Sequence, residues 1–106
     1  MSKKINYVAR SKAIGISTKI EAKGHNYYLD EPTSVGGENK GPTPLHALLG
    51  ALASCESITA FAAAKVMNIQ VDELTFDING ELDPRGMKGD KEVKTYFEKR
   101  FCLYTN

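Results

Sequence analysis

The chain has 106 residues, of which 42% are hydrophobic and 25% charged, and its 14 Lys and Arg nearly balance its 13 Asp and Glu. This length predicts a single domain over residues 1–106. A domain of this size buries roughly two-thirds of the surface that its unfolded chain exposes, so it needs neither a metal nor a disulfide to fold. The formal charge of +1 and the lack of a basic run argue against a nucleic-acid partner.

The two cysteines, Cys55 and Cys102, stand 47 positions apart and form no C-x-x-C pair. Neither histidine lies at a metal-ligand spacing from them, so we predict no metal and no cofactor. The charged N-terminus is not followed by the apolar run of a signal peptide, which favours a cytoplasmic location. Cysteines stay reduced in that compartment, so each one is either inert packing or part of the chemistry.

The first third of the chain shows the period-two alternation of half-buried strands. We expect strands over residues 5–9, 14–22 and 25–29, arranged as an antiparallel meander with Gly24 in a turn. Residues 30–42 hold three Gly and two Pro among thirteen residues, which predicts a loop. Ordered loops of this length tend to be functional or to cover something, but a solvated linker remains equally open.

A long helix follows this loop. Thr43 is a good N-cap and Pro44 suits the first helical position. Residues 45–67 carry charges only at Glu56 and Lys65, and the apolar residues cover most of the helix circumference, so we expect the helix to be buried nearly all round. It is long enough to cross a bilayer, but Glu56 near its middle would be costly there, and we predict no membrane span.

The alternating pattern returns after the helix. Leu74, Phe76 and Ile78 predict a strand, residues 83–90 a turn, and the chain then ends in a last strand that runs toward Asn106. The predicted order is β-β-β-α-β-β, an α+β fold with antiparallel sheet strands around a central helix. One chain covers about half of this helix with its own strands, so a second copy should cover the rest in a homodimer.

Cys55 falls near the middle of the predicted helix. Its small and apolar neighbours favour an inert buried thiol. A reactive thiol needs a cation, an imidazolium or a helix N-terminus close by, and the N-terminus of this helix is about three turns away. The cation would therefore come from elsewhere in the chain, and the guanidinium groups on offer are those of Arg10, Arg85 and Arg100.

The two histidines and the second cysteine are weaker candidates for a catalytic role. His46 precedes Cys55 by nine residues, which at about 100° each places it on the opposite face of the helix. We expect it to face the loop or a partner subunit rather than to serve as a base for Cys55. His25 could approach the helix or lie on a polar strand face. Cys102 lies between Phe101 and Leu103, and we expect packing or a free thiol there rather than a redox partner.

The segment from Gly36 to Cys55, with its G-G-x-x-x-G-P-T-P signature followed by a small apolar helix and a cysteine, resembles the OsmC/Ohr family. The preceding G-H-x-x-x-x-D-E-P, from Gly24 to Pro32, is similar to the OsmC-like branch, and the likeness extends through residues 83–90. It implies an intertwined homodimer around buried central helices. It also implies a cysteine peroxidase that reduces organic hydroperoxides at the expense of a thiol reductant, with Cys55 as the peroxidatic thiol and Arg10 as the cation beside it.

The chain also departs from that family's pattern. Leu45 and His46 stand where members of the family carry a glutamate that orients the arginine, and the segment with the resolving cysteine is expected beyond Asn106, so the domain is predicted to be short at its C-terminus. These departures favour an alternative function. In that alternative the protein is a non-catalytic dimer that binds a small apolar ligand or serves as an assembly module.

Overall fold

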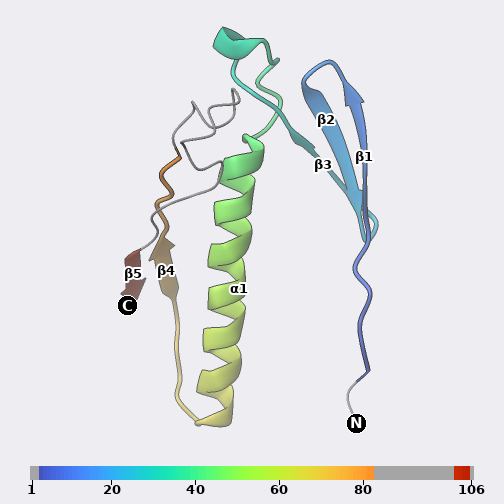
Figure 1. Ribbon diagram of the computed structural model, residues 1–106. Coiled ribbons are helices and arrows are strands. Elements are labelled where there is room, and N and C mark those ends of the chain that lie inside the picture. Colours follow the sequence, from blue (N-terminus) through green and yellow to red (C-terminus); the bar gives the residue numbers. More distant parts are fainter. Residues whose placement is uncertain (1–2, 83–101, 106) are drawn as a thin grey trace. The chain divides into compact units, whose positions relative to one another are not determined.

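The computed structural model describes residues 3–82 and 102–105. The chain divides into two compact units, Met1–Ala47 and Leu48–Asn106, and each unit is described by itself. The described elements follow the order of three strands, one helix and two strands (Figure 1). This order confirms the predicted α+β class with antiparallel strands.

The first unit contains a three-stranded antiparallel sheet in the order β1-β2-β3. The strands are β1 (Ala9–Ile14), β2 (Ser17–Ala22) and β3 (His25–Leu29). Two-residue turns join them, because Ile14 pairs with Ser17 and Ala22 pairs with His25. Lys23 and Gly24 both have positive φ, as a type I′ hairpin turn requires, so the predicted turn at Gly24 is confirmed.

The predicted bounds of the first two strands are wrong. Residues 14–22 do not form one strand, because Gly15 adopts a φ of 65° and turns the chain between β1 and β2. Residues 5–8 lie outside the sheet, and β1 begins only at Ala9. A turn of two residues leaves the period-two alternation unbroken. The alternation from Ile14 onward therefore gave no sign of the turn at Gly15. Within β2 the alternation holds, since Lys19 and Glu21 are exposed between half-buried neighbours.

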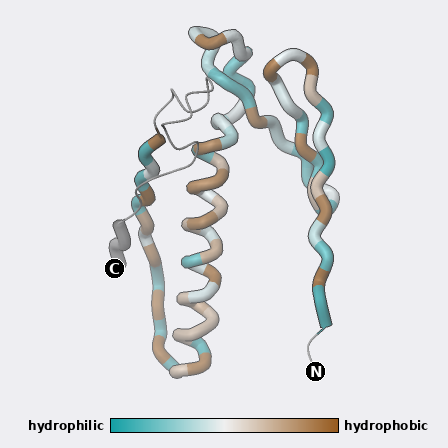
Figure 2. The backbone as a smooth tube through the Cα atoms, in the orientation of Figure 1, coloured by the Kyte–Doolittle hydropathy of each residue, from teal (hydrophilic) through white to brown (hydrophobic). Residues whose placement is uncertain are grey.

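The helix α1 spans Pro44–Val66, close to its predicted bounds. It ends where Asn68 takes a positive φ of 57° and the Ile69 N–H donates to the carbonyl oxygen of Ala64 at 2.8 Å, a left-handed helix stop. Successive turns carry apolar residues (Figure 2). Length and composition would let α1 cross a membrane, but core helices share both properties.

Within the described part of the single chain no residue of α1 is buried, so the predicted burial of this helix between sheets or between two subunits stays a prediction. Leu48 is 58% exposed and Ile58 is 67% exposed. Across the described residues no apolar side chain is buried, and the two buried side chains, Ser17 and Asp30, are both polar.

The second unit adds β4 (Leu74–Asp77) and β5 (Cys102–Thr105), which pair antiparallel with Asp77 opposite Cys102. In β4 the predicted alternation is confirmed, because Leu74 and Phe76 are half-buried while the residues beside them are exposed. The predicted turn at residues 83–90 and the early part of the predicted last strand lie outside the described residues.

Candidate functional site

The most enclosed side chain of the first unit is Asp30, which directly follows β3 and is 1% exposed. The Ser17 hydroxyl donates to its Oδ2 at 2.6 Å, and the Lys40 N–H donates to the same oxygen at 3.1 Å. The Glu31 N–H donates to Oδ1 at 2.7 Å, and the Glu38 N–H lies 3.3 Å from both oxygens. The loop therefore folds its own amides around a carboxylate, as backbone amides surround a bound anion.

These donors set the charge of Asp30. The Ser17 hydroxyl, against an opposing effect of burial, and the N–H groups of Glu31, Lys40 and Glu38 together lower the pKa of Asp30 from 3.8 to about 2. The Ser17 oxygen also lies 3.2 Å from Oε2 of Glu38. Because a hydroxyl has one hydrogen, the shorter contact to Asp30 receives it.

The glycines of the G-G-x-x-x-G signature leave room for this fold. A Cβ on Gly37 would overlap the carbonyl oxygen of Glu31, and a Cβ on Gly41 would overlap the carbonyl oxygen of Tyr28. Gly36 ends the short 3-10 helix η1 (Thr33–Val35) with a φ of 97°. Gly37 and Gly41 therefore allow the backbone to approach another backbone segment closely, and Gly36 allows a left-handed turn.

Further contacts join the two ends of the loop of residues 30–42 and pack its side chains together. The Asp30 N–H donates to the Pro42 carbonyl oxygen at 3.0 Å, which ties the two ends of the loop together. Lys40 Nζ lies 3.6 Å from Glu38 Oε2 and 5.4 Å from the centre of the Tyr28 ring. Residues 30–42 therefore form a folded element, not a solvated linker.

The loop leads directly into the capped start of α1. Thr43 is the predicted N-cap, and its Oγ1 accepts the His46 N–H at 3.1 Å. His46 also places its Nδ1 2.6 Å from the same oxygen. His46 is thus engaged locally, at the beginning of the helix.

Cys55 is a free, exposed cysteine near the middle of α1. Residues three and four positions away along a helix are its neighbours on the surface. For Cys55 these neighbours are uncharged: Ala51, Leu52, Ile58 and Thr59. The helix itself supplies no cation beside this thiol.

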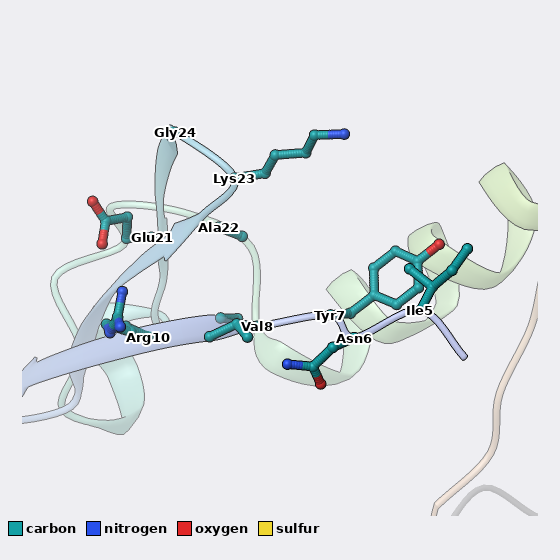
Figure 3. Close-up of a pocket in the computed structure, with 10 residues that line it drawn as sticks. Ile5, Asn6, Tyr7, Val8, Arg10, Glu21, Ala22, Lys23 and Gly24 are labelled. Carbon is teal, nitrogen blue, oxygen red and sulfur yellow. The ribbon is translucent and has the colours of Figure 1, made fainter. Parts of the chain in front are cut away.

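Arg10 lies in β1 directly opposite Glu21 of β2. It lines a hollow of about 950 Å³ formed by residues 5–10 and 21–24. Arg10 and Glu21 stand at one end of this hollow and the side chains of Ile5 and Tyr7 at the other (Figure 3). The hollow thus holds a guanidinium group at one end and exposed apolar side chains at the other, all within the first unit.

The predicted site residues therefore fall in different units, with Arg10 in the first and Cys55 in the second. Their pairing stays a prediction. Cys102 begins β5, and its side chain lies outside the described part of the chain. His25 is exposed at the start of β3. Within the described residues no cluster of three or more His, Cys, Asp or Glu could hold a metal ion.

The roles of Asp30 and Ser17 were not predicted from the sequence. The only available signal was an aspartate directly after a strand and before a glycine-rich loop, a position where its side chain can bond to following backbone amides.

Comparisons with known proteins identify the family of the segment that contains α1. The family model described as OsmC-like protein matches residues 37–101, which include α1, Cys55 and β4. No curated protein matches the chain. The family match covers more than half of the sequence and begins at Gly37, inside the glycine signature. The chain therefore belongs to the OsmC-like family, whose context is redox chemistry and osmotic or oxidative stress.

Proposed function

We propose that this protein is a cytoplasmic, homodimeric thiol peroxidase that reduces organic hydroperoxides. The observation that carries the proposal is the free, exposed thiol of Cys55, which lies in mid-helix inside the segment matched by the family model. The resemblance assigns the peroxidatic role to this cysteine.

The chemistry uses the sulfur as a two-electron reductant. The Cys55 thiolate attacks the outer oxygen of R–O–O–H, the O–O bond breaks, and the alkoxide leaves as alcohol after it takes up a proton. Sulfur is oxidised to a sulfenic acid and the peroxide is reduced. A dithiol then attacks the sulfenic sulfur, water leaves, and the second thiol of the reductant cleaves the mixed disulfide, which returns Cys55 to a thiol.

In this proposal Arg10 supplies the positive charge that stabilises the Cys55 thiolate. The helix offers Cys55 no charged neighbour at three or four positions, so the thiolate needs a cation from another element or from a second subunit. Arg10 presents a guanidinium beside an apolar hollow, where a hydroperoxide with a hydrocarbon group would be accommodated. Within the described residues Arg10 has no ion pair that would occupy it.

The test is the rate at which the full chain consumes cumene hydroperoxide in the presence of dithiothreitol. We expect Cys55→Ser to abolish the rate and Cys102→Ser, which removes the other cysteine, to retain it. A full rate in Cys55→Ser would show that Cys55 is not the nucleophile.

The same assay tests Arg10. Arg10→Gln should lower the rate at least tenfold, since it removes the charge that stabilises the thiolate. Lys12→Gln removes a positive charge from the same strand and is the matched control. Equal rates for the two variants would remove Arg10 from the proposal.

A second function has its own support. Apolar side chains such as Leu48 and Ile58 are exposed on α1, and Tyr7 is 86% exposed beside the hollow. These surfaces also suit a non-catalytic dimer that binds a small apolar ligand or serves as an assembly module. That function predicts no peroxide consumption and a Cys55 that iodoacetamide alkylates no faster than free cysteine at pH 6.

A further inference from the structure

His46 contacts the N-cap of α1 through both its backbone and its ring. Thr43 Oγ1 accepts the backbone N–H of His46 at 3.1 Å and lies 2.6 Å from His46 Nδ1. Among the described contacts the hydroxyl hydrogen of Thr43 has no other acceptor, so it can point at the ring nitrogen. We therefore assign Nδ1 as an acceptor and place the ring hydrogen on Nε2, the neutral imidazole.

Proton uptake reverses this arrangement. A protonated Nδ1 can only donate, so Thr43 Oγ1 would have to accept two hydrogen bonds while its own hydrogen loses its acceptor. The imidazolium would also sit at the positive end of the helix dipole. Both effects weaken the first turn of α1.

Among the described residues no carboxylate is bonded to the His46 ring. The first turn of α1 carries no acidic residue, and the charges further along the helix, Glu56 and Lys65, lie more than two turns away. In the preceding loop Glu38 is paired with Lys40, and the Asp30 carboxylate is enclosed by Ser17 and backbone amides. The remaining charged group of that loop, Glu31, has no contact with the ring among the described interactions.

We propose that Thr43 and His46 form a pH-sensitive cap, which holds the first turn of α1 while the imidazole is neutral and loosens it when the imidazole takes up a proton. Histidine side chains change charge between pH 5 and 8. His46 occupies the third helical position, where a capping box normally has Glu or Gln, and neither of these changes charge in that range. The cap is independent of the peroxidase proposal, since it involves no reacting group.

The test is amide hydrogen exchange in the full chain at pH 5.5 and 7.5, corrected for intrinsic rates. The reporters are the His46 N–H, which donates to Thr43 Oγ1, and the Ala47 N–H, which donates to the Thr43 carbonyl oxygen at 2.9 Å. We expect their protection to fall about fivefold on acidification, the factor of one typical hydrogen bond. His46→Gln should abolish this fall, and His25→Gln, which removes the other histidine, should leave it intact.

Two results would overturn the cap. One is that wild type and His46→Gln respond alike to acidification, whether both lose amide protection equally or neither loses it. The other comes from the wild-type chain alone, through nitrogen NMR of the imidazole at pH 7.5. The proposal requires Nδ1 to be unprotonated there, and a ring hydrogen on Nδ1 would contradict it whether or not the variants fold.

Discussion

Asp30 is the residue around which the first unit is organised. Its carboxylate receives the Ser17 hydroxyl and three backbone N–H groups, and it is the most deeply buried of the described side chains. A carboxylate in that position stabilises the loop only while it is ionised, because a protonated oxygen cannot accept from the same donors as strongly. The stability of the loop is therefore linked to pH.

The sign of this dependence follows from the pKa of Asp30, which the hydrogen bonds lower from 3.8 to about 2. Below about pH 4 the unfolded chain takes up a proton at this position before the folded chain does, so folding loses stability as the pH falls toward 2. We expect the thermal midpoint of wild type to fall between pH 5 and pH 2.5, and Asp30→Asn to show a smaller fall. Circular dichroism measures both.

The charge control for this experiment is Asp77→Asn, which removes an exposed carboxylate from β4. Ser17→Ala provides a second variant, since it removes the hydrogen bond that contributes most to the low pKa of Asp30 and should also reduce the acid response. An Asp30→Asn protein with the same acid response as wild type would contradict the role of this carboxylate.

At the scale of elements, the loop of residues 30–42 depends on glycine for close approach. Gly37→Ala would bring a methyl group onto the carbonyl oxygen of Glu31, and such overpacking typically costs about 1–3 kcal/mol. We expect a matching loss in the free energy of unfolding, measured by urea titration.

Gly50→Ala is the matched control for Gly37→Ala. A Cβ at Gly50 meets nothing within 4 Å, and this glycine lies inside α1, where alanine is favoured by roughly 0.5–1 kcal/mol. The same substitution should therefore stabilise the chain at Gly50 and destabilise it at Gly37. Equal effects at both positions would refute the close-approach argument.

The elements differ in how far the sequence predicts them. The helix α1 could be predicted almost to its ends, because Thr43 and Pro44 mark its start and a largely apolar segment without a further proline follows. The turn at Gly15 could not, since a two-residue turn preserves the alternation on both sides.

The candidate site was harder to predict than the elements. Cys55 stands out as a cysteine in mid-helix, but the enclosure of Asp30 by Ser17 and Lys40 joins residues far apart along the chain. No local pattern encodes such contacts, because they depend on how the loop folds back toward the start of β2, beside the end of β3.

At the scale of the whole molecule, the absence of buried apolar side chains among the described residues has a direct consequence. Burial of apolar surface is the main favourable contribution to folding, and a polar cluster around Asp30 does not replace it. The exposed apolar residues of α1 favour a second surface that packs on this helix. We expect that surface to be another copy of this chain, since two-fold homodimers are the commonest assembly.

Sedimentation velocity tests this expectation. The folded protein should sediment as a dimer at micromolar concentration, and dilution into the monomer range should be accompanied by loss of helical signal in circular dichroism. A folded monomer that keeps its helix at every concentration would show that α1 needs no partner.

The peroxidatic role of Cys55 can be tested by trapping its oxidised form. The full chain is treated with one equivalent of cumene hydroperoxide in the presence of dimedone, which traps sulfenic acids, and the modified residues are located by mass spectrometry. We expect rapid adduct formation at Cys55, faster than at free cysteine under the same conditions. A Cys55 that stays unmodified, or that reacts no faster than free cysteine, would contradict it.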